Sequence, residues 1–117
     1  MNFDPYSAAV RTLFAEPRHA GPLGGSNERN TQGEAAESLQ GACVRIHAGW
    51  QGDKLADLRF EAFGCPHLLA TAEWACRTRL ESGDAFDVQA CMTELAIPVE
   101  KMGRVLLVED ALKSAGV

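Results

Sequence analysis

Hydrophobic and polar residues alternate along two consecutive stretches in the middle of the chain, residues 43–50 and 55–63. The apolar positions that alternation assigns to one side are Val44, Ile46, Ala48, Trp50, Leu58, Phe60 and Ala62. A Gly-Asp turn within residues 51–54 separates the two stretches. The pattern predicts an antiparallel hairpin with one buried face, and the opposed charges on its other face suit cross-strand pairing.

After residue 65 the apolar period changes from two to about 3.6, which indicates helices. The first predicted helix begins at Pro66 and ends at Ser82-Gly83, the second is capped by Asp84, and the third covers about 98–115. Their expected apolar stripes are Leu69, Ala72, Cys76 and Leu80; then Val88, Cys91, Met92 and Leu95; then Met102, Val105, Leu106 and Leu112.

The N-terminal part predicts a short helix followed by a loop. Asp4 or Pro5 opens the helix, and Val10, Leu13 and Phe14 share one of its faces. Residues 17–40 are rich in Gly, Pro, Asn and Ser, so we expect a long, flexible, mostly irregular loop, with a poor strand or a helical turn as alternatives near its end.

These elements together predict an α+β fold in a single domain spanning 1–117. Its small antiparallel sheet, of about three strands, is covered on one face by helices.

Charge and composition narrow the function classes. The chain of 117 residues has a formal net charge of -5 and no basic run, so nucleic-acid binding is not expected. Its first residues carry neither a positively charged start nor a long apolar stretch, so we expect no secretory signal, no membrane span and a cytoplasmic location. No catalytic triad, phosphate loop or carboxylate pair stands out, which indicates a protein that is not an enzyme.

Cys65 is the strongest candidate for chemistry because it separates the hairpin from the first predicted helix. Free amide N–H groups and the positive end of the helix dipole favour the thiolate, which is the nucleophile and the metal ligand. The alternative is a small residue at a tight strand-to-helix turn, and the local sequence leaves both open.

The other cysteines differ in their expected exposure. Cys43 begins the first hairpin strand on its polar face, so it is a second candidate ligand. Cys76 and Cys91 lie on apolar stripes, where a small buried residue is the simpler interpretation. No Cys-x-x-Cys pair supports a zinc ribbon or a thioredoxin-type site, and a reducing environment argues against disulfides.

The histidines are expected to be solvent-exposed. His67 follows Cys65 by two residues, but at 3.6 residues per turn its side chain points about 200° away from the cysteine. His19 and His47 lie in the predicted loop and on the polar strand face.

The order of elements resembles the iron–sulfur cluster assembly scaffold family of the IscU/NifU N-terminal type. Residues 6–23 are similar to that family's opening helix and its Asn-Pro-Arg-Asn-x-Gly stretch. Residues 57–74 are similar to its Ala-Arg-Phe-x-x-Phe-Gly-Cys segment, and residues 95–115 to its Leu-Pro-Pro-Val-Lys loop and final helix. The resemblance spans nearly the whole chain and implies a three-stranded sheet with helices on one face.

The resemblance also implies a ligand set. The family holds a [2Fe–2S] cluster or a zinc ion in a shallow site at one end of the sheet. Its ligands come from a Cys-Gly-Asp stretch, from the cysteine of Phe-Gly-Cys, and from a His-Cys pair at the start of the last helix. Thiolate-rich sets suit this chemistry, and Cys65 matches the second of these segments.

The other family ligands fall on different residue types in this chain. When the Cys-Gly-Asp stretch is aligned without a gap, its cysteine corresponds to Gln40 and its aspartate to Ala42. A small gap would instead let Cys43 serve as the ligand. The His-Cys pair falls on Gly103 and Arg104, which brings a positive charge into the pocket.

Three functions remain open on these residues. The first is a divergent scaffold or carrier that binds an iron–sulfur cluster or a metal ion through Cys65, with Cys43, a histidine or a second subunit completing the site. The second is a cluster-free paralogue that binds a cysteine desulfurase or another assembly protein. The third is a persulfide acceptor at Cys65. Chaperone binding is not expected, because 97–101 lacks one family proline and gains an acid.

Overall fold

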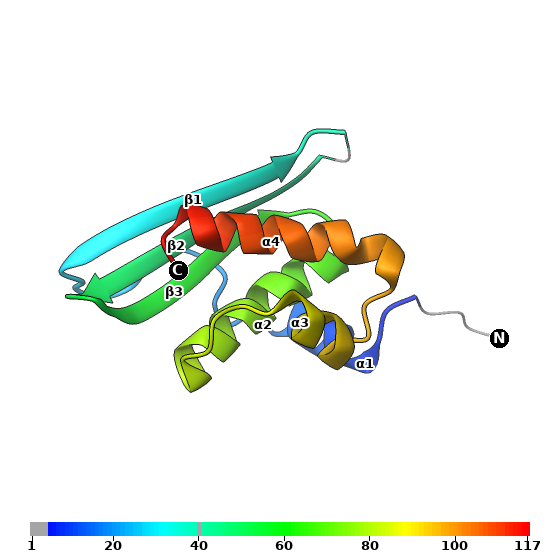
Figure 1. The fold of residues 1–117 in the computed structure, drawn as a ribbon, viewed down its shortest axis with the longest axis horizontal. Helices are drawn as coiled ribbons and strands as arrows, with labels where there is room; N and C mark the ends of the chain where they lie inside the picture. The colour runs from blue at the N-terminus through cyan, green and yellow to red at the C-terminus, as the bar shows by residue number, and fades with distance from the viewer. Residues whose placement is uncertain (1–4, 40) are drawn as a thin grey trace.

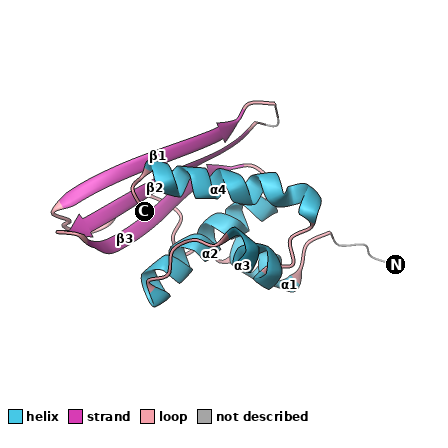
Figure 2. Ribbon diagram, in the orientation of Figure 1, coloured by secondary structure: helices cyan, strands magenta, loops and turns pink. Residues whose placement is uncertain are grey.

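The computed structural model describes residues 5–39 and 41–117. The elements are α1 (Ala8–Ala15), β1 (Arg29–Glu37), β2 (Ala42–Gln51), β3 (Lys54–Phe63), α2 (Pro66–Ser82), α3 (Val88–Glu94), a 3-10 helix (Val99–Lys101) and α4 (Met102–Ser114). The three strands form one antiparallel sheet in the order β1-β2-β3. All helices lie on one side of this sheet (Figures 1 and 2), which confirms the α+β prediction.

The predicted hairpin is confirmed with its buried face. Gln51 pairs with Lys54 across the tight turn. The side chains that alternation assigned to one face pack against α2 and α4 in the main core: Val44, Ile46, Ala48, Trp50, Leu58 and Phe60, with Ala62 at its margin. The opposite sheet face carries partly exposed charged side chains, including the Arg45 to Glu34 ion pair.

The loop prediction for 17–40 is wrong for residues 29–33, which form the first part of β1, and the strand alternative near its end is confirmed for residues 34–37. The sequence of β1 shows no apolar alternation because the side chains that point toward the helices are small. A Cβ on Gly33 would lie 2.2 Å from the Ala111 carbonyl oxygen, so β1 and α4 touch backbone to backbone. Thr31 strengthens this contact by donating its hydroxyl to the Ala115 carbonyl at 2.7 Å. Gln40, the last residue of the predicted loop, lies outside the described residues.

The segment before β1 is held to α2 by a buried carboxylate. Glu73 is fully buried and accepts hydrogen bonds from the His19 backbone N–H at 2.7 Å and from Arg77 Nε at 2.7 Å. His19 Nδ1 lies 2.6 Å from the second carboxylate oxygen of Glu73. The prediction of an exposed His19 is therefore wrong, because this ring anchors its segment and has a side-chain exposure of 19%.

Three helix details differ from the predictions. Ser7 caps α1, so Pro5 does not open it, and Asp4 lies outside the described residues. Asp87, not Asp84, caps α3 by accepting from the Ala90 N–H at 3.0 Å. Phe14 and Leu106 were expected on buried faces but are exposed, because α1 and α4 each pack through a narrower stripe than the periodicity suggested.

The C-terminal helix also begins differently. It opens with the 3-10 turn Val99–Lys101 and becomes α-helical at Met102. By contrast, the predicted start of α2 at Pro66 and its end at Gly83 are confirmed, with Gly83 in the left-handed conformation.

A second core packs α1, α2 and α3 together on the side of α2 away from the sheet. Because α2 lies between the two cores, buried residues occur almost all around it. Within the described residues, no helix combines the length and the apolar character needed to cross a membrane.

Candidate functional site

Cys65 lies where the sequence placed it, at the N-cap of α2 directly after β3. Its backbone is extended, with φ −78° and ψ 164°, and Pro66 starts the helix. Its thiol makes no capping hydrogen bond to the described helix amides, and its side chain is only partly buried. The thiol is therefore accessible and is not committed to a structural hydrogen bond.

The residue before Cys65 brings this junction against β2. A Cβ on Gly64 would lie 2.8 Å from Leu68 Cδ2 and 3.5 Å from the Cβ of Ala42. Ala42 is therefore the β2 residue that faces the junction, and its exposed fraction is 2%. A methyl group occupies the place that the resemblance assigns to an aspartate.

Cys43 faces the other way. It pairs with Ala36 and Phe63 in one row across the three strands, on the sheet face that no helix covers. It lines a cavity of about 230 Å³ together with Glu34, Val44, Arg45, Glu61, Ala62 and Phe63. Cys65 instead packs at the edge of the helix-covered core. The structure thus does not bring these two predicted ligands together, and their metal-binding roles stay predictions.

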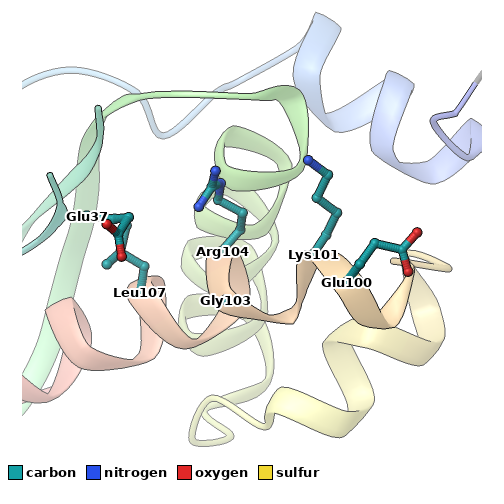
Figure 3. Close-up of a pocket in the computed structure, with 6 residues that line it drawn as sticks. All are labelled: Glu37, Glu100, Lys101, Gly103, Arg104 and Leu107. Atoms are coloured by element: carbon teal, nitrogen blue, oxygen red, sulfur yellow. The ribbon is translucent and has the colours of Figure 1, made fainter. Parts of the chain in front are cut away.

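A cavity of about 240 Å³ lies at the start of α4, where the resemblance placed the His-Cys pair. It is lined by Glu37, Glu100, Lys101, Gly103, Arg104 and Leu107. Figure 3 shows the Lys101 and Arg104 side chains pointing toward the connection between β3 and α2, the segment that includes Cys65. Arg104 Nε is inaccessible to solvent and has no hydrogen-bond partner among the described residues.

The donor set at this end of the sheet does not hold a metal by itself. Across residues 5–39 and 41–117, no three His, Cys, Asp or Glu side chains gather closely enough to coordinate a metal ion. An iron–sulfur cluster takes four protein ligands as a rule. Among the described residues, the segments at this end of the sheet therefore supply the accessible Cys65 thiol and two cations, Lys101 and Arg104, which is fewer donors than a cluster takes.

His67 is a residue that sequence reasoning misplaced. Only 2% of it is exposed, and neither ring nitrogen has a hydrogen-bond partner in the described part of the chain. Its ring lies 4.8 Å from that of Tyr6, centre to centre. Burial and the nearby positive charge of Lys101 lower the pKa of His67, so the neutral imidazole is favoured. The prediction failed because it treated α2 as a helix with one buried face.

The structure brings His47 and Glu61 together on the open face of the sheet. His47 Nε2 lies 2.5 Å from Glu61 Oε1, and the histidine side chain is 17% exposed. The expectation of a freely exposed His47 is therefore wrong, since a cross-strand carboxylate holds the ring.

The other two cysteines are buried, as predicted. Burial raises the pKa of the Cys76 thiol strongly and, despite a hydrogen bond with Thr71, raises the pKa of the Cys91 thiol to about 12. Both therefore stay protonated and unreactive in the folded chain.

Comparison with known proteins places this arrangement in a family. Residues 5–117 match the family described as NifU-like N terminal domain. The chain belongs to this family. The match covers nearly all of the sequence and confirms the resemblance drawn from its motifs.

Two curated relatives are similar over most of the chain. The iron–sulfur cluster assembly protein IscU of Plasmodium falciparum is 30% identical, with 94% of this chain and 70% of the relative covered. The iron–sulfur cluster assembly scaffold protein IscU of Escherichia coli K12 is 25% identical, with 94% and 90% covered.

Solved structures share the fold. A putative iron–sulfur cluster assembly scaffold protein for the SUF system from Fervidobacterium islandicum superposes with a TM-score of 0.70 at 16% identity, covering 95% of this chain and 96% of that one. The N-terminal part of a NifU-like protein from Brucella abortus gives 0.65 at 14% identity, with 93% and 90% covered.

Proposed function

We propose that this protein is a divergent, non-enzymatic scaffold or carrier in iron–sulfur cluster assembly and that Cys65 is its ligand for a cluster or metal ion. Membership in the NifU-like N terminal domain family and the names of the curated relatives support the process. The observation that carries the residue assignment is the accessible Cys65 thiol at the N-terminus of α2. A thiolate there is the ligand type that iron–sulfur and zinc chemistry require.

The remaining ligands come from a partner or from a second copy of the chain. Gly103 and Arg104 cannot supply thiolate or imidazole donors, and Ala42 supplies no carboxylate. A carrier with so few ligands holds its cargo only while another assembly protein, such as a cysteine desulfurase, contributes thiolates or sulfide. Cys43 is the second candidate ligand in the chain, but from the open sheet face it can only serve a separate contact.

The test is iron and sulfide analysis of protein purified without oxygen and reconstituted with iron, cysteine and a cysteine desulfurase. We expect visible absorbance and bound iron in the wild type and in Cys43→Ser, and loss of both in Cys65→Ser. A colourless, iron-free wild-type protein after this treatment would exclude cluster or iron carriage. A persulfide on Cys65 in such iron-free protein, detected by mass spectrometry, would assign the thiol to sulfur transfer instead.

A second function is favoured by Arg104, a cation at a position where the resemblance expects a metal ligand. Arg104 and Lys101 suit docking on assembly proteins better than holding a metal cation, so a cluster-free binding partner is the alternative. Its test is co-purification with a cysteine desulfurase and measurement of the desulfurase rate. Binding or a changed rate that persists in Cys65→Ser would support it, and the absence of both would exclude it.

A further inference from the structure

The cavity at the start of α4 has an ordered distribution of charge. Along the cavity in Figure 3, Glu37 lies at one end, Arg104 and Lys101 in the middle, and Glu100 at the other end. Gly103 lies below Arg104 in Figure 3, and a Cβ there would meet no atom within 4 Å. The middle of the cavity therefore presents two positive side chains, and Gly103 adds no side chain that would narrow it.

The two cations are not neutralised by contact. Among the described residues, neither Arg104 nor Lys101 takes part in an ion pair, and Arg104 Nε is buried with no acceptor. A buried donor without an acceptor is destabilising, and more so when the group is charged. An acceptor that enters the cavity would recover this free energy.

The two carboxylates do not occupy the middle of the cavity. Glu37 accepts a hydrogen bond from the Leu39 N–H at 3.0 Å, and its side chain lies beside Leu107. Glu100 extends away from Arg104, on the far side of Lys101. Both carboxylates lower the net attraction for an anion, but in Figure 3 neither lies between Arg104 and Lys101.

We propose that this cavity binds a small oxyanion, such as phosphate, sulfate or a carboxylate group, between Arg104 and Lys101. A guanidinium forms paired hydrogen bonds with such groups, and an ammonium adds a strongly hydrated point charge. The 3-10 turn before α4 already binds the Met102 N–H through the Val99 carbonyl, so the attraction comes from the two cationic side chains. This site goes beyond the proposed function, because it needs neither Cys65 nor a cluster.

The experiment is a titration of isotope-labelled protein with inorganic phosphate at constant pH and ionic strength, followed by amide NMR shifts. Sulfate and acetate titrations show whether tetrahedral oxyanions or carboxylates are preferred, and chloride is the salt control. We expect saturable shifts concentrated in residues 101–107. Arg104→Gln should weaken phosphate binding at least tenfold, and Lys101→Gln should weaken it by a smaller factor.

Lys54→Gln is the matched control, because it removes one exposed positive charge from the first residue of β3. It should leave the phosphate affinity unchanged. Shifts that do not saturate, or that are spread over many surface cations, would indicate an adventitious ion only and overturn the proposal. Unchanged binding in Arg104→Gln would overturn it as well. Iron content is not measured in this titration. A negative result therefore overturns the oxyanion site without affecting the cluster proposal, and the reverse also holds.

Discussion

At the scale of single residues, the position of each cysteine in the fold decides what its thiol can do. Cys76 and Cys91 lie inside the two cores, where burial favours the neutral thiol. Cys43 and Cys65 are both partly exposed, but on different faces of the sheet. Two of the four thiols are therefore accessible, and the other two are inert.

Thiol labelling should reproduce this division. In native protein at pH 8, iodoacetamide should modify Cys43 and Cys65 and leave Cys76 and Cys91 unmodified, because alkylation needs an accessible thiolate. Peptide mass spectrometry reads out each site, and labelling in urea supplies the reference for full reaction. Rapid native labelling of Cys76 or Cys91 would contradict the buried positions described above.

Glu73 is a second single residue whose surroundings matter, because its carboxylate is buried. It accepts from a backbone N–H and an arginine and lies against a histidine ring, so its charge is compensated inside the protein. Breaking a buried charge pair by removing one partner costs about 3–5 kcal/mol.

Glu73→Gln should accordingly lower the free energy of unfolding by about 3 kcal/mol, because the amide leaves Arg77 without its charged partner. Urea denaturation followed by circular dichroism measures the change. Glu81→Gln, at an exposed position in the same helix, is the matched control and should stay within about 0.5 kcal/mol of the wild type. Equal stability of the two variants would show that the Glu73 contacts contribute little.

At the scale of elements, the contact between β1 and α4 depends on the lack of a side chain at Gly33. A Cβ there would come within 2.3 Å of the Ala115 backbone nitrogen as well as the Ala111 oxygen. Neither atom can move without shifting α4, so the helix and the strand fit only with glycine at this position.

Gly33→Ala should therefore destabilise the protein by about 1–3 kcal/mol, as overpacking of a well-packed contact does. Gly103→Ala is the matched glycine variant. It should stabilise the protein by roughly 0.5–1 kcal/mol, because it lies in α4 with open space around it and alanine favours a helix. Thermal unfolding of both variants checks the opposite signs. The same sign in both would contradict the close approach of β1 and α4.

At the scale of the whole molecule, the fold gathers three distant segments at one end of the sheet. The start of β2, the β3–α2 junction and the start of α4 meet there. Of the residues that the resemblance aligns without a gap to family ligands, only Cys65 is of a metal-ligand type. The candidate site therefore depends on side chains from three segments that are distant in the sequence.

Introducing the histidine and the cysteine that the resemblance aligns with Gly103 and Arg104 should create a metal site. Gly103→His combined with Arg104→Cys would place an imidazole and a second thiolate near Cys65, a set typical of zinc. After dialysis against a weak chelator, we expect about one zinc ion per chain in this double variant and little in the wild type. Adding Cys65→Ser should reduce the zinc content. A double variant without zinc would contradict the placement of Cys65 opposite the start of α4.

The hairpin, the start of α2 and the two accessible thiols could be predicted from the sequence. Alternation over 43–50 and 55–63 reports a sheet with one buried face, because successive side chains on a strand point to opposite sides. The change of period at Cys65, followed by Pro66, marks a helix start, because proline suits the first helical position. These are local properties, and they also carried the family resemblance.

The tertiary structure alone decided the features that depend on neighbours distant in the sequence. β1 shows no apolar alternation because its partner is the backbone of α4, and His67 is buried because α2 lies between two cores. The buried role of Glu73 required His19, which is 54 positions away. The cavity joins Glu37 to Arg104 only once β1 and α4 have packed together. Burial and charge at these positions are set by packing partners, and periodicity along one segment contains no information about them.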